Sequence, residues 1–273
     1  MKIKIYNILL IVGIIAVVIF YFGPVFWTIL ISLKPEEEVY SLNLPSKIIV
    51  DRYYKVFTSG KFIPTFLNSV KVAFITTPLL VLLASPASYT IARFKDFKGR
   101  SGVFTLFLVM MLLPHVAIAG YIYTMLSELG LYDTIPGLII TYSGLFTPFA
   151  VWILTSYFRG IPKEIEEAAL VDGASRLSIF SKVIIPLSLP GIAVTAILCF
   201  IIIWSEFLIA YTITLTYNAR PVTIGTLLFV GLYELQWSEV ATAALIATLP
   251  VLIIAFLTSK YIVKGLTAAV IRA

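Results

Sequence analysis

The chain has 273 residues, of which 60% are hydrophobic and only 12% are charged, and its mean hydropathy is +1.02. Since soluble domains carry about 25% charged residues, this composition excludes an ordinary soluble protein and predicts an integral membrane protein in a lipid bilayer. The net charge of +6 comes without the aromatic-interleaved basic clusters of single-strand binders, so no nucleic acid partner is expected.

Six apolar segments are long enough to cross a bilayer, which needs about 20 residues in a helix. They lack the alternation of barrel strands, so each is predicted to be helical. The first follows Lys2 and Lys4, but it is longer than the roughly 7–15 apolar residues of a signal peptide and is expected to remain as a span. The predicted spans are residues 8–33, 66–92, 102–126, 135–157, 184–210 and 240–263 of a single transmembrane domain, residues 1–273.

The basic residues predict how these spans are oriented. Most of the 20 Lys and Arg residues fall on the side of the N-terminus, and the tightest cluster is RFKDFKGR at Arg93–Arg100. The positive-inside rule therefore places both termini and the loop at residues 160–186 in the cytoplasm. The prediction is an all-α, multi-pass protein of the cell membrane, with larger outer segments at Lys34–Thr65 and Tyr211–Glu239.

The loop at residues 160–186 carries charges of both signs between two apolar spans. Pro162 is tolerated in a first helical turn, and the carboxylates that follow it favour the positive end of a helix. Gly173 suits a left-handed C-terminal cap, and Ser175 is placed to cap a second helix over Arg176–Ile184. The pattern predicts two short helices bent at Gly173, and the alternative is an ordinary amphipathic loop on the lipid surface.

Part of this loop resembles the docking signature of ABC importer permeases, E-A-A-x3-G-x9-I-x-L-P. The match starts at Glu167 and runs through Gly173 to Pro186, with Val183 and Ile185 in place of the Ile and Leu of the signature. In that family the loop docks on an ATPase subunit. The resemblance implies a coupling role for these residues: Glu166, Glu167, Ala168, Ala169, Asp172, Gly173, Arg176 and Pro186.

Three further stretches resemble the sugar-transporting branch of this family, which includes the smaller permease subunit of maltose/trehalose-type systems. They are WSEF at Trp204–Phe207, where Ser205 replaces the usual Asn, the stretch Leu227–Pro250 and the tail Tyr261–Ala273. The resemblance implies the type I ABC importer permease fold. It also implies four kinds of chain in one complex: this permease, a second permease subunit, two ATPase subunits and an extracytoplasmic substrate-binding protein.

No residue of this chain is expected to be catalytic. The chain lacks the phosphate-binding pattern G-x4-G-K-[ST] and the metalloprotease pattern H-E-x-x-H, and its sole histidine, His115, excludes a multi-histidine metal site. The sole cysteine, Cys199, lies in an apolar run and is interpreted as a packing residue. We therefore expect no metal or cofactor on this chain, with ATP and Mg on the partner ATPase subunits.

Glu206 is the one acidic residue inside a predicted span, where a carboxylate facing lipid is costly. It is expected to face the paired permease, the outer interface or a cavity, where it would accept hydrogen bonds from sugar hydroxyls. Candidates for a substrate path are Trp204, Glu206, Tyr211, Tyr142 and Ser143, whose alternatives are an aromatic belt and helix packing. The resemblance implies a loop that enters the binding protein, formed by Asn218, Ala219, Arg220 and Pro221, and its alternative is a plain surface turn.

Together these features predict the transmembrane permease subunit of an ATP-driven, binding-protein-dependent sugar importer, which is not itself an enzyme. A first alternative keeps the importer and changes the cargo to a peptide, a polyamine or a phosphate ester such as glycerol phosphate. A second is an ion-driven secondary carrier, although the chain shows neither repeated halves nor several intramembrane acids. A purely structural membrane scaffold leaves the spacing of the signature unexplained.

Overall fold

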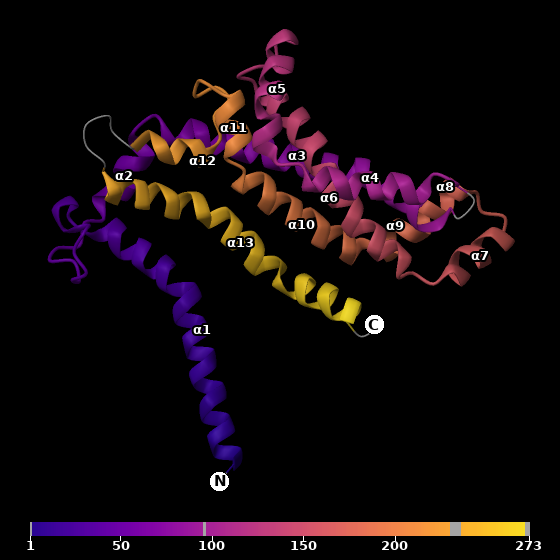
Figure 1. Cartoon of the computed structure of the whole chain (residues 1–273), viewed down its shortest axis with the longest axis horizontal. Coiled ribbons are helices and arrows are strands. Elements are labelled where there is room, and N and C mark those ends of the chain that lie inside the picture. The colour runs from indigo at the N-terminus through magenta and orange to yellow at the C-terminus, as the bar shows by residue number, and fades with distance from the viewer. Residues whose placement is uncertain (1, 95–96, 230–235, 271–273) are drawn as a thin grey trace. The chain divides into compact units, whose positions relative to one another are not determined.

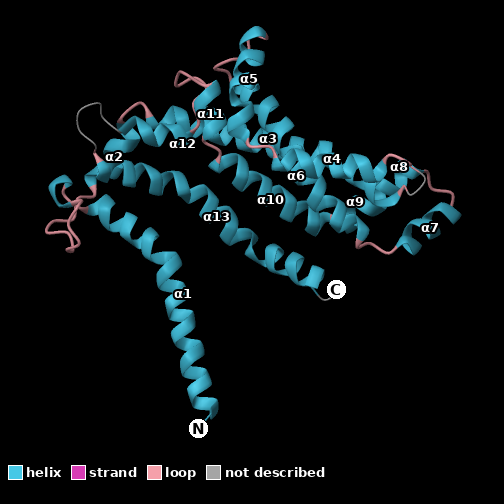
Figure 2. Ribbon diagram, viewed as in Figure 1, coloured by secondary structure: helices cyan, strands magenta, loops and turns pink. Residues whose placement is uncertain are grey.

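The computed structural model describes residues 2–94, 97–229 and 236–270, and the regular elements in these ranges are all helical (Figures 1 and 2). They are α1 (Lys2–Leu33), the 3₁₀ helix η1 (Glu36–Glu38), α2 (Asp51–Thr58), α3 (Phe62–Arg93), α4 (Arg100–Leu112), α5 (His115–Glu128), α6 (Ile135–Arg159), α7 (Lys163–Val171), α8 (Arg176–Ile179), the π-helix η2 (Phe180–Ile184), α9 (Ile185–Leu187), α10 (Leu189–Ser205), α11 (Leu208–Ile213), α12 (Val222–Gly225), the 3₁₀ helix η3 (Thr226–Phe229) and α13 (Trp237–Val270).

Four helices are long and apolar enough to cross a membrane, and they match four of the predicted spans: Leu9–Leu33, Phe62–Arg93, Ile135–Arg159 and Trp237–Thr258. The other two predicted spans are divided in the structure. Helices α4 and α5 meet at 95°, and the segment from Arg176 to Leu187 meets α10 at 74°. The described residues therefore contain four candidate spans, or up to six if each bent pair counts as one.

Proline explains the break in the span predicted at residues 102–126. Leu113 and Pro114 have extended backbone, with ψ angles of 124° and 116°. A proline disfavours helical backbone at the preceding residue and lacks an N–H donor, so α4 ends before Leu113 and α5 begins after Pro114. The span predicted at residues 184–210 also stops early, because α10 ends at Ser205.

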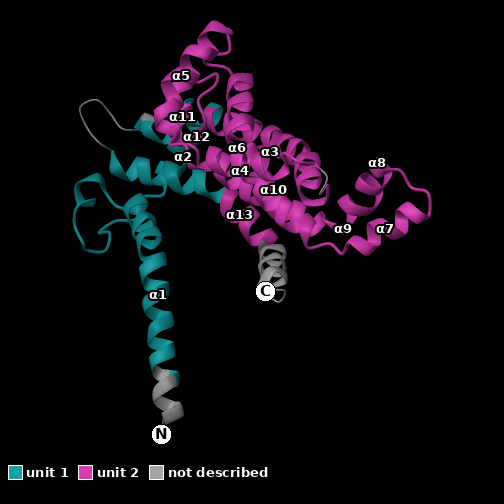
Figure 3. Cartoon of the chain, turned by 45° about the vertical axis from the view of Figure 1, so that its right-hand side comes forward, with its two compact units in different colours: residues 1–64, 225–249 teal, residues 65–224, 250–273 magenta. Residues whose placement is uncertain are grey.

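The chain divides into two compact units, drawn in teal and magenta in Figure 3. The first unit comprises residues 1–64 and 225–249, and the second comprises residues 65–224 and 250–273. The residues of the loop at 160–186, of the predicted substrate path and of the predicted binding-protein loop all belong to the second unit. The two units are groups of residues that contact one another more than they contact the rest of the chain. The single transmembrane domain expected from the sequence stays a prediction.

Charged side chains hold the first unit together. The Glu36 carboxylate accepts hydrogen bonds from the backbone N–H groups of Trp237, at 2.6 Å, and Ser238, at 3.1 Å, and so caps the start of α13. Lys34 is fully buried, donates to a backbone carbonyl at 2.7 Å and lies 4.7 Å from the centroid of the Trp27 ring. These contacts offset the cost of burying its charge.

Helix α6 is central to the second unit, because both α4 and α10 pack against it. Its fully buried side chains are Leu138, Tyr142, Ala150, Val151, Leu154, Thr155 and Phe158. At the start of α10 the two helices come very close. A Cβ atom at Gly191 would lie 2.4 Å from two ring carbons of Tyr157 on α6, so this contact requires glycine.

Gly191→Ala is expected to destabilise the second unit by about 1–3 kcal/mol, because the rigid Tyr157 ring must move to admit the methyl group. The measurement is thermal unfolding of the purified protein in detergent. Gly144→Ala on α6 is the matched control, since a Cβ atom there would have no heavy atom within 4 Å. Equal unfolding temperatures for the two variants would contradict the close packing of α10 on α6.

Candidate functional site

The loop at residues 160–186 folds as two short helices bent at Gly173, as predicted, except that α8 ends at Ile179 and the rest of the helix predicted over Arg176–Ile184 is the π-helix η2. Gly173 has a φ of +81°, a left-handed conformation that glycine adopts without strain. The N–H groups of Gly173 and Ala174 donate to carbonyls of α7 at 3.0 Å and close its C-terminal cap. Helix α8 begins after Ser175, whose hydroxyl accepts the N–H of Ser178 at 3.2 Å, as the sequence predicts.

We call α7, the Gly173 turn and α8 the elbow; in Figure 3, α7 and α8 lie at one end of the magenta unit. Most of the predicted coupling residues are exposed: Glu167, Ala168, Asp172, Gly173, Arg176 and Pro186. Ala169 is half-buried. Two apolar side chains, Val171 and Leu177, are 88% and 75% exposed. Exposed apolar side chains among charges are typical of a surface that docks another protein.

Glu166 differs from the other predicted coupling residues because it is buried, with 5% of its surface exposed. Its Oε1 atom lies 2.5 Å from Nε of Arg93, the last residue of α3. The Tyr89 hydroxyl donates to Oε2 of the same carboxylate at 3.0 Å. Arg93 also donates through Nη2 to the carbonyl of Ile161, at 2.7 Å. The buried carboxylate is thus paired and hydrogen-bonded, as a buried charge must be.

From the sequence alone, Glu166 is grouped with Glu167, and Arg93 is only a marker of membrane topology. Helical spacing distinguishes the buried glutamate from the exposed one. Glu166 and the half-buried Ala169 are three residues apart and share a face of α7, whereas Glu167 lies on the exposed side. Tyr89 was not singled out at all. No local pattern reveals it, because its partner is far away in the sequence.

Two of the predicted path residues, Tyr142 and Glu206, lie in contact. The Tyr142 hydroxyl donates to Oε2 of Glu206 at 2.7 Å. The same carboxylate accepts the backbone N–H groups of Ile209, at 2.7 Å, and Ala210, at 3.0 Å, which open helix α11. Glu206 therefore caps α11 at the point where α10 has ended, a role that was not predicted from the sequence.

The other path residues are placed differently. Trp204 is buried, with its ring stacked on Phe200 at a centroid distance of 5.5 Å. Tyr211 is 60% exposed and stacks on Phe207 at 5.7 Å. The Ser143 hydroxyl is buried without a hydrogen-bond partner among the described residues. Of the five predicted path residues, Tyr142 and Glu206 are thus joined by a hydrogen bond, and the rings of Trp204 and Tyr211 stack on other aromatic side chains.

The predicted binding-protein loop is fixed by side chains of its own unit. Asn68 donates to the carbonyls of Tyr217, at 2.8 Å, and Arg220, at 3.1 Å. Ala219 and Pro221 are buried, Arg220 is half-buried and Asn218 is exposed. Of the four residues proposed for this loop, Asn218 is therefore the one most available to another protein.

Asp133 fastens the same loop at its start. Its carboxylate accepts the N–H of Leu215, at 2.7 Å, and both the N–H and the hydroxyl of Thr216, at 3.0 and 2.7 Å. Burial raises the pKa of this carboxyl, but the three hydrogen bonds and the charge of Arg220 outweigh burial and hold the pKa below its ordinary value. The stabilisation is therefore complete above the ordinary pKa of about 3.9 and is lost as the pH falls through the lowered value.

Asp133→Ala is expected to speed amide hydrogen exchange at Leu215 and Thr216 by about fivefold, the effect of losing a cap worth roughly 1 kcal/mol. The measurement is exchange mass spectrometry of the protein in detergent at neutral pH. Asp133→Asn is the matched control, because asparagine keeps an acceptor oxygen and tolerates the φ of +56° found here. Unchanged exchange in Asp133→Ala would contradict the fastening of this loop.

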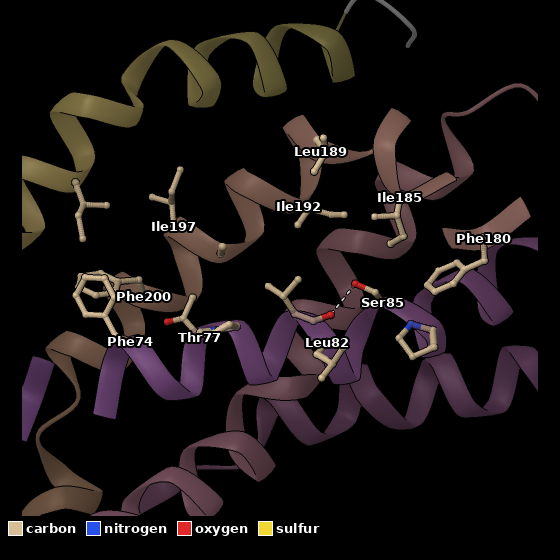
Figure 4. Close-up of a pocket in the computed structure, with 15 residues that line it drawn as sticks. Phe74, Thr77, Leu82, Ser85, Phe180, Ile185, Leu189, Ile192, Ile197 and Phe200 are labelled. Carbon is tan, nitrogen blue, oxygen red and sulfur yellow. Dashed lines mark hydrogen bonds between the residues drawn. The ribbon is translucent and has the colours of Figure 1, made fainter. Parts of the chain in front are cut away.

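A cavity of about 780 Å³ opens between α3 and α10 and is almost entirely apolar. Figure 4 shows Phe74 and Leu82 of α3 opposite Ile192 and Ile197 of α10. The Ser85 hydroxyl in its wall is already bonded to a backbone carbonyl of its own helix, at 2.6 Å. A polar ligand needs convergent hydrogen-bonding groups, so this groove is unsuited to one, and none of the predicted path residues lines it.

A family model described as the inner membrane component of binding-protein-dependent transport systems matches residues 82–268. The chain belongs to this family. The elbow and the apolar helices are thus those of an ABC transporter permease, a multi-pass transport subunit of the membrane. The resemblance drawn from the signature around Glu167 is confirmed at the level of the family.

Relatives of this inner membrane component match it over nearly its whole length. The trehalose/maltose transport system permease protein MalG of Thermococcus litoralis is 35% identical over 270 residues, which is 97% of each chain. The trehalose transport system permease protein SugB of Mycobacterium tuberculosis is 33% identical, and the alignment covers 91% of this chain and 92% of that one.

The fold of this inner membrane component is also found among solved structures. A chain in the crystal structure of a bacterial ABC transporter involved in the import of the acidic polysaccharide alginate matches with a TM-score of 0.80 and 21% identity. The match covers 94% of this chain and 96% of that chain. It shows the helical fold of type I ABC importer permeases.

Proposed function

We propose that this chain is one of two permease subunits that form the translocation path of an ATP-driven, binding-protein-dependent importer. The observation that carries the proposal is the elbow, whose exposed face combines Glu167 with the apolar Val171 and Leu177 while its buried face is fixed by Glu166. Such a projection suits a docking partner better than a lipid surface, because its outer face carries carboxylates. The partner that fits is one of two ATPase subunits, which bind the ATP and Mg.

The arrangement in the membrane follows from the same proposal. The chain forms one permease domain with six spans, in which each bent helix pair counts as one, and both termini lie in the cytoplasm with the elbow. Helix α1 supports a second permease as partner, since its most hydrophobic window contains no buried residue. The outer loop around Asn218 faces the extracytoplasmic binding protein. Glu206 lies between the elbow and that loop in the chain, and its partner Tyr142 lies on α6, before the elbow.

The proposed cargo is a sugar or short oligosaccharide. The support is the identity of 35% and 33% to permeases named for trehalose and maltose transport. A peptide, a polyamine or glycerol phosphate is the alternative within the same mechanism. ATP binding closes the ATPase pair, the elbow moves, and the permease pair alternates between its inward-facing and outward-facing states.

The test is uptake by vesicles that contain this chain with the second permease, the ATPase subunits and the binding protein. Radiolabelled trehalose, maltose, a dipeptide, spermidine and glycerol phosphate are offered in turn, with and without ATP inside. We expect ATP-dependent uptake of one of the sugars. ATP-dependent uptake of another compound in the panel would show that the proposed cargo is wrong and would identify the cargo. Uptake that needs an ion gradient and no ATP would refute the proposed mechanism.

A further inference from the structure

We propose that the buried Glu166–Arg93 pair, together with Tyr89, is the joint that transmits movement of the elbow to helix α3. This proposal rests on the proposed function, because it requires an ATPase subunit that moves the elbow. Glu166, Arg93 and Tyr89 are then positioning residues, which act through the helices that they join. The exposed Glu167 receives the movement and the buried Glu166 passes it on.

Arg93 holds the elbow at two places. Its Nε atom lies 2.5 Å from Oε1 of Glu166 in the middle of α7, and its Nη2 atom donates to the carbonyl of Ile161, before α7, at 2.7 Å. A guanidinium is planar and rigid, so one side chain fixes the start and the middle of α7 in a single geometry. The Tyr89 hydroxyl, one turn earlier on α3, fixes the second carboxylate oxygen at 3.0 Å.

The exit from the elbow is held by the same end of α3. The guanidinium of Arg176 on α8 lies 5.5 Å from the centroid of the Phe94 ring, which directly follows α3. The Phe180 ring, in the π-helix after α8, lies 5.0 Å from the Tyr89 ring. These ring contacts are specific in geometry and favourable in energy. The residues before, within and after the elbow therefore all contact the stretch from Tyr89 to Phe94.

A buried ion pair makes this joint stiff. The side chains of Arg93 and Glu166 are 5% and 6% exposed, so sliding α7 along α3 would leave a buried charge without its partner. The elbow and the end of α3 are thus expected to move as one body. Because α3 forms one wall of the apolar groove in Figure 4 and α10 forms another, such a movement changes the spacing between these two helices.

The test compares Glu166→Gln, Arg93→Glu and Tyr89→Phe with the double variant R93E/E166R, which reverses the charges. Glu164→Gln, an exposed carboxylate on the same helix, is the matched control. Each variant is assembled with its partners in vesicles, and the readout is the number of ATP molecules hydrolysed per cargo molecule imported. The cargo is radiolabelled trehalose, or the compound that the panel above selects in its place.

We expect Glu166→Gln and Arg93→Glu to raise this ratio by about tenfold or more, and Tyr89→Phe to raise it less, because it removes one hydrogen bond and keeps the ring. The double variant is expected to recover part of the loss, and Glu164→Gln to match the wild type. A purely structural role would lower hydrolysis and uptake together, because fewer complexes assemble, and an unchanged ratio would overturn the proposal.

Two further results bear on the joint. A double variant no better than the worse single variant would also overturn it. If Glu166→Gln and Arg93→Glu fail to fold, Tyr89→Phe decides alone: a raised ratio supports the joint and an unchanged ratio refutes it. If the wild-type complex shows no ATP-driven uptake, the proposed function itself is refuted. Failure of the joint and failure of the proposed function therefore give different results.

Discussion

Glu167→Lys is expected to leave the permease folded and to lower ATP-driven uptake by about a hundredfold or more, because a like charge across a protein interface costs several kcal/mol. The proposed docking places Glu167 against a basic residue of the ATPase. The Glu167 side chain is exposed and has no hydrogen bond or ion pair with the residues that the structure describes. Exposed substitutions of this kind change the free energy of unfolding by about 0.5 kcal/mol or less.

The measurement pairs thermal unfolding of the purified variant with ATP hydrolysis and uptake in vesicles. We expect an unchanged unfolding temperature and hydrolysis that no longer drives uptake. Glu164→Lys is the matched control, because Glu164 lies on the same helix, carries the same charge and is also exposed. Normal uptake in Glu167→Lys would count against docking at the elbow, and equal losses in both variants would indicate a general effect of charge.

The elbow shows how much of the site local sequence predicts. The signals that begin and end these two helices involve only neighbouring residues, within one or two helical turns. They are a proline before the first helix, a glycine with left-handed backbone at its end and a serine hydroxyl before the second helix. Pro162, Gly173 and Ser175 therefore reveal the two helices and the bend without any knowledge of the rest of the chain. The four long spans were predictable for a similar reason, since hydropathy is summed over neighbouring residues.

Contacts between distant residues were not predictable in this way. The pairing of Arg93 with Glu166 and the bond between Tyr142 and Glu206 join residues that are more than 60 positions apart, and no spacing rule in the sequence connects them. Pro114 is a local signal for a break in the third predicted span, but hydropathy does not predict the 95° angle because both sides of the break are apolar. Hydropathy predicts that a segment is buried in lipid or protein, but it does not predict where the helix axis changes direction.

Glu206→Ala is expected to destabilise the permease by about 3 kcal/mol or more, because it leaves three buried donors without an acceptor, and each unpaired donor costs roughly 1–3 kcal/mol. These donors are the N–H groups of Ile209 and Ala210 and the hydroxyl of Tyr142, all of which are 0–1% exposed. Water that would replace the carboxylate at a protein surface is scarce inside a membrane. The measurement is thermal unfolding in detergent, with Tyr142→Phe expected to cost less because it removes a single donor.

Glu206→Gln separates this capping role from contact with the cargo. Glutamine keeps one acceptor oxygen, which can receive both the Ala210 N–H and the Tyr142 hydroxyl, so part of the stability is expected to return, while the negative charge is gone. If Glu206 serves only α11 and Tyr142, the KM for cargo in this variant stays close to the wild-type value, and kcat follows the amount of folded complex. A raised KM with an unchanged unfolding temperature would instead place the carboxylate on the substrate path, where binding to the cargo, and not the integrity of α11, depends on its charge.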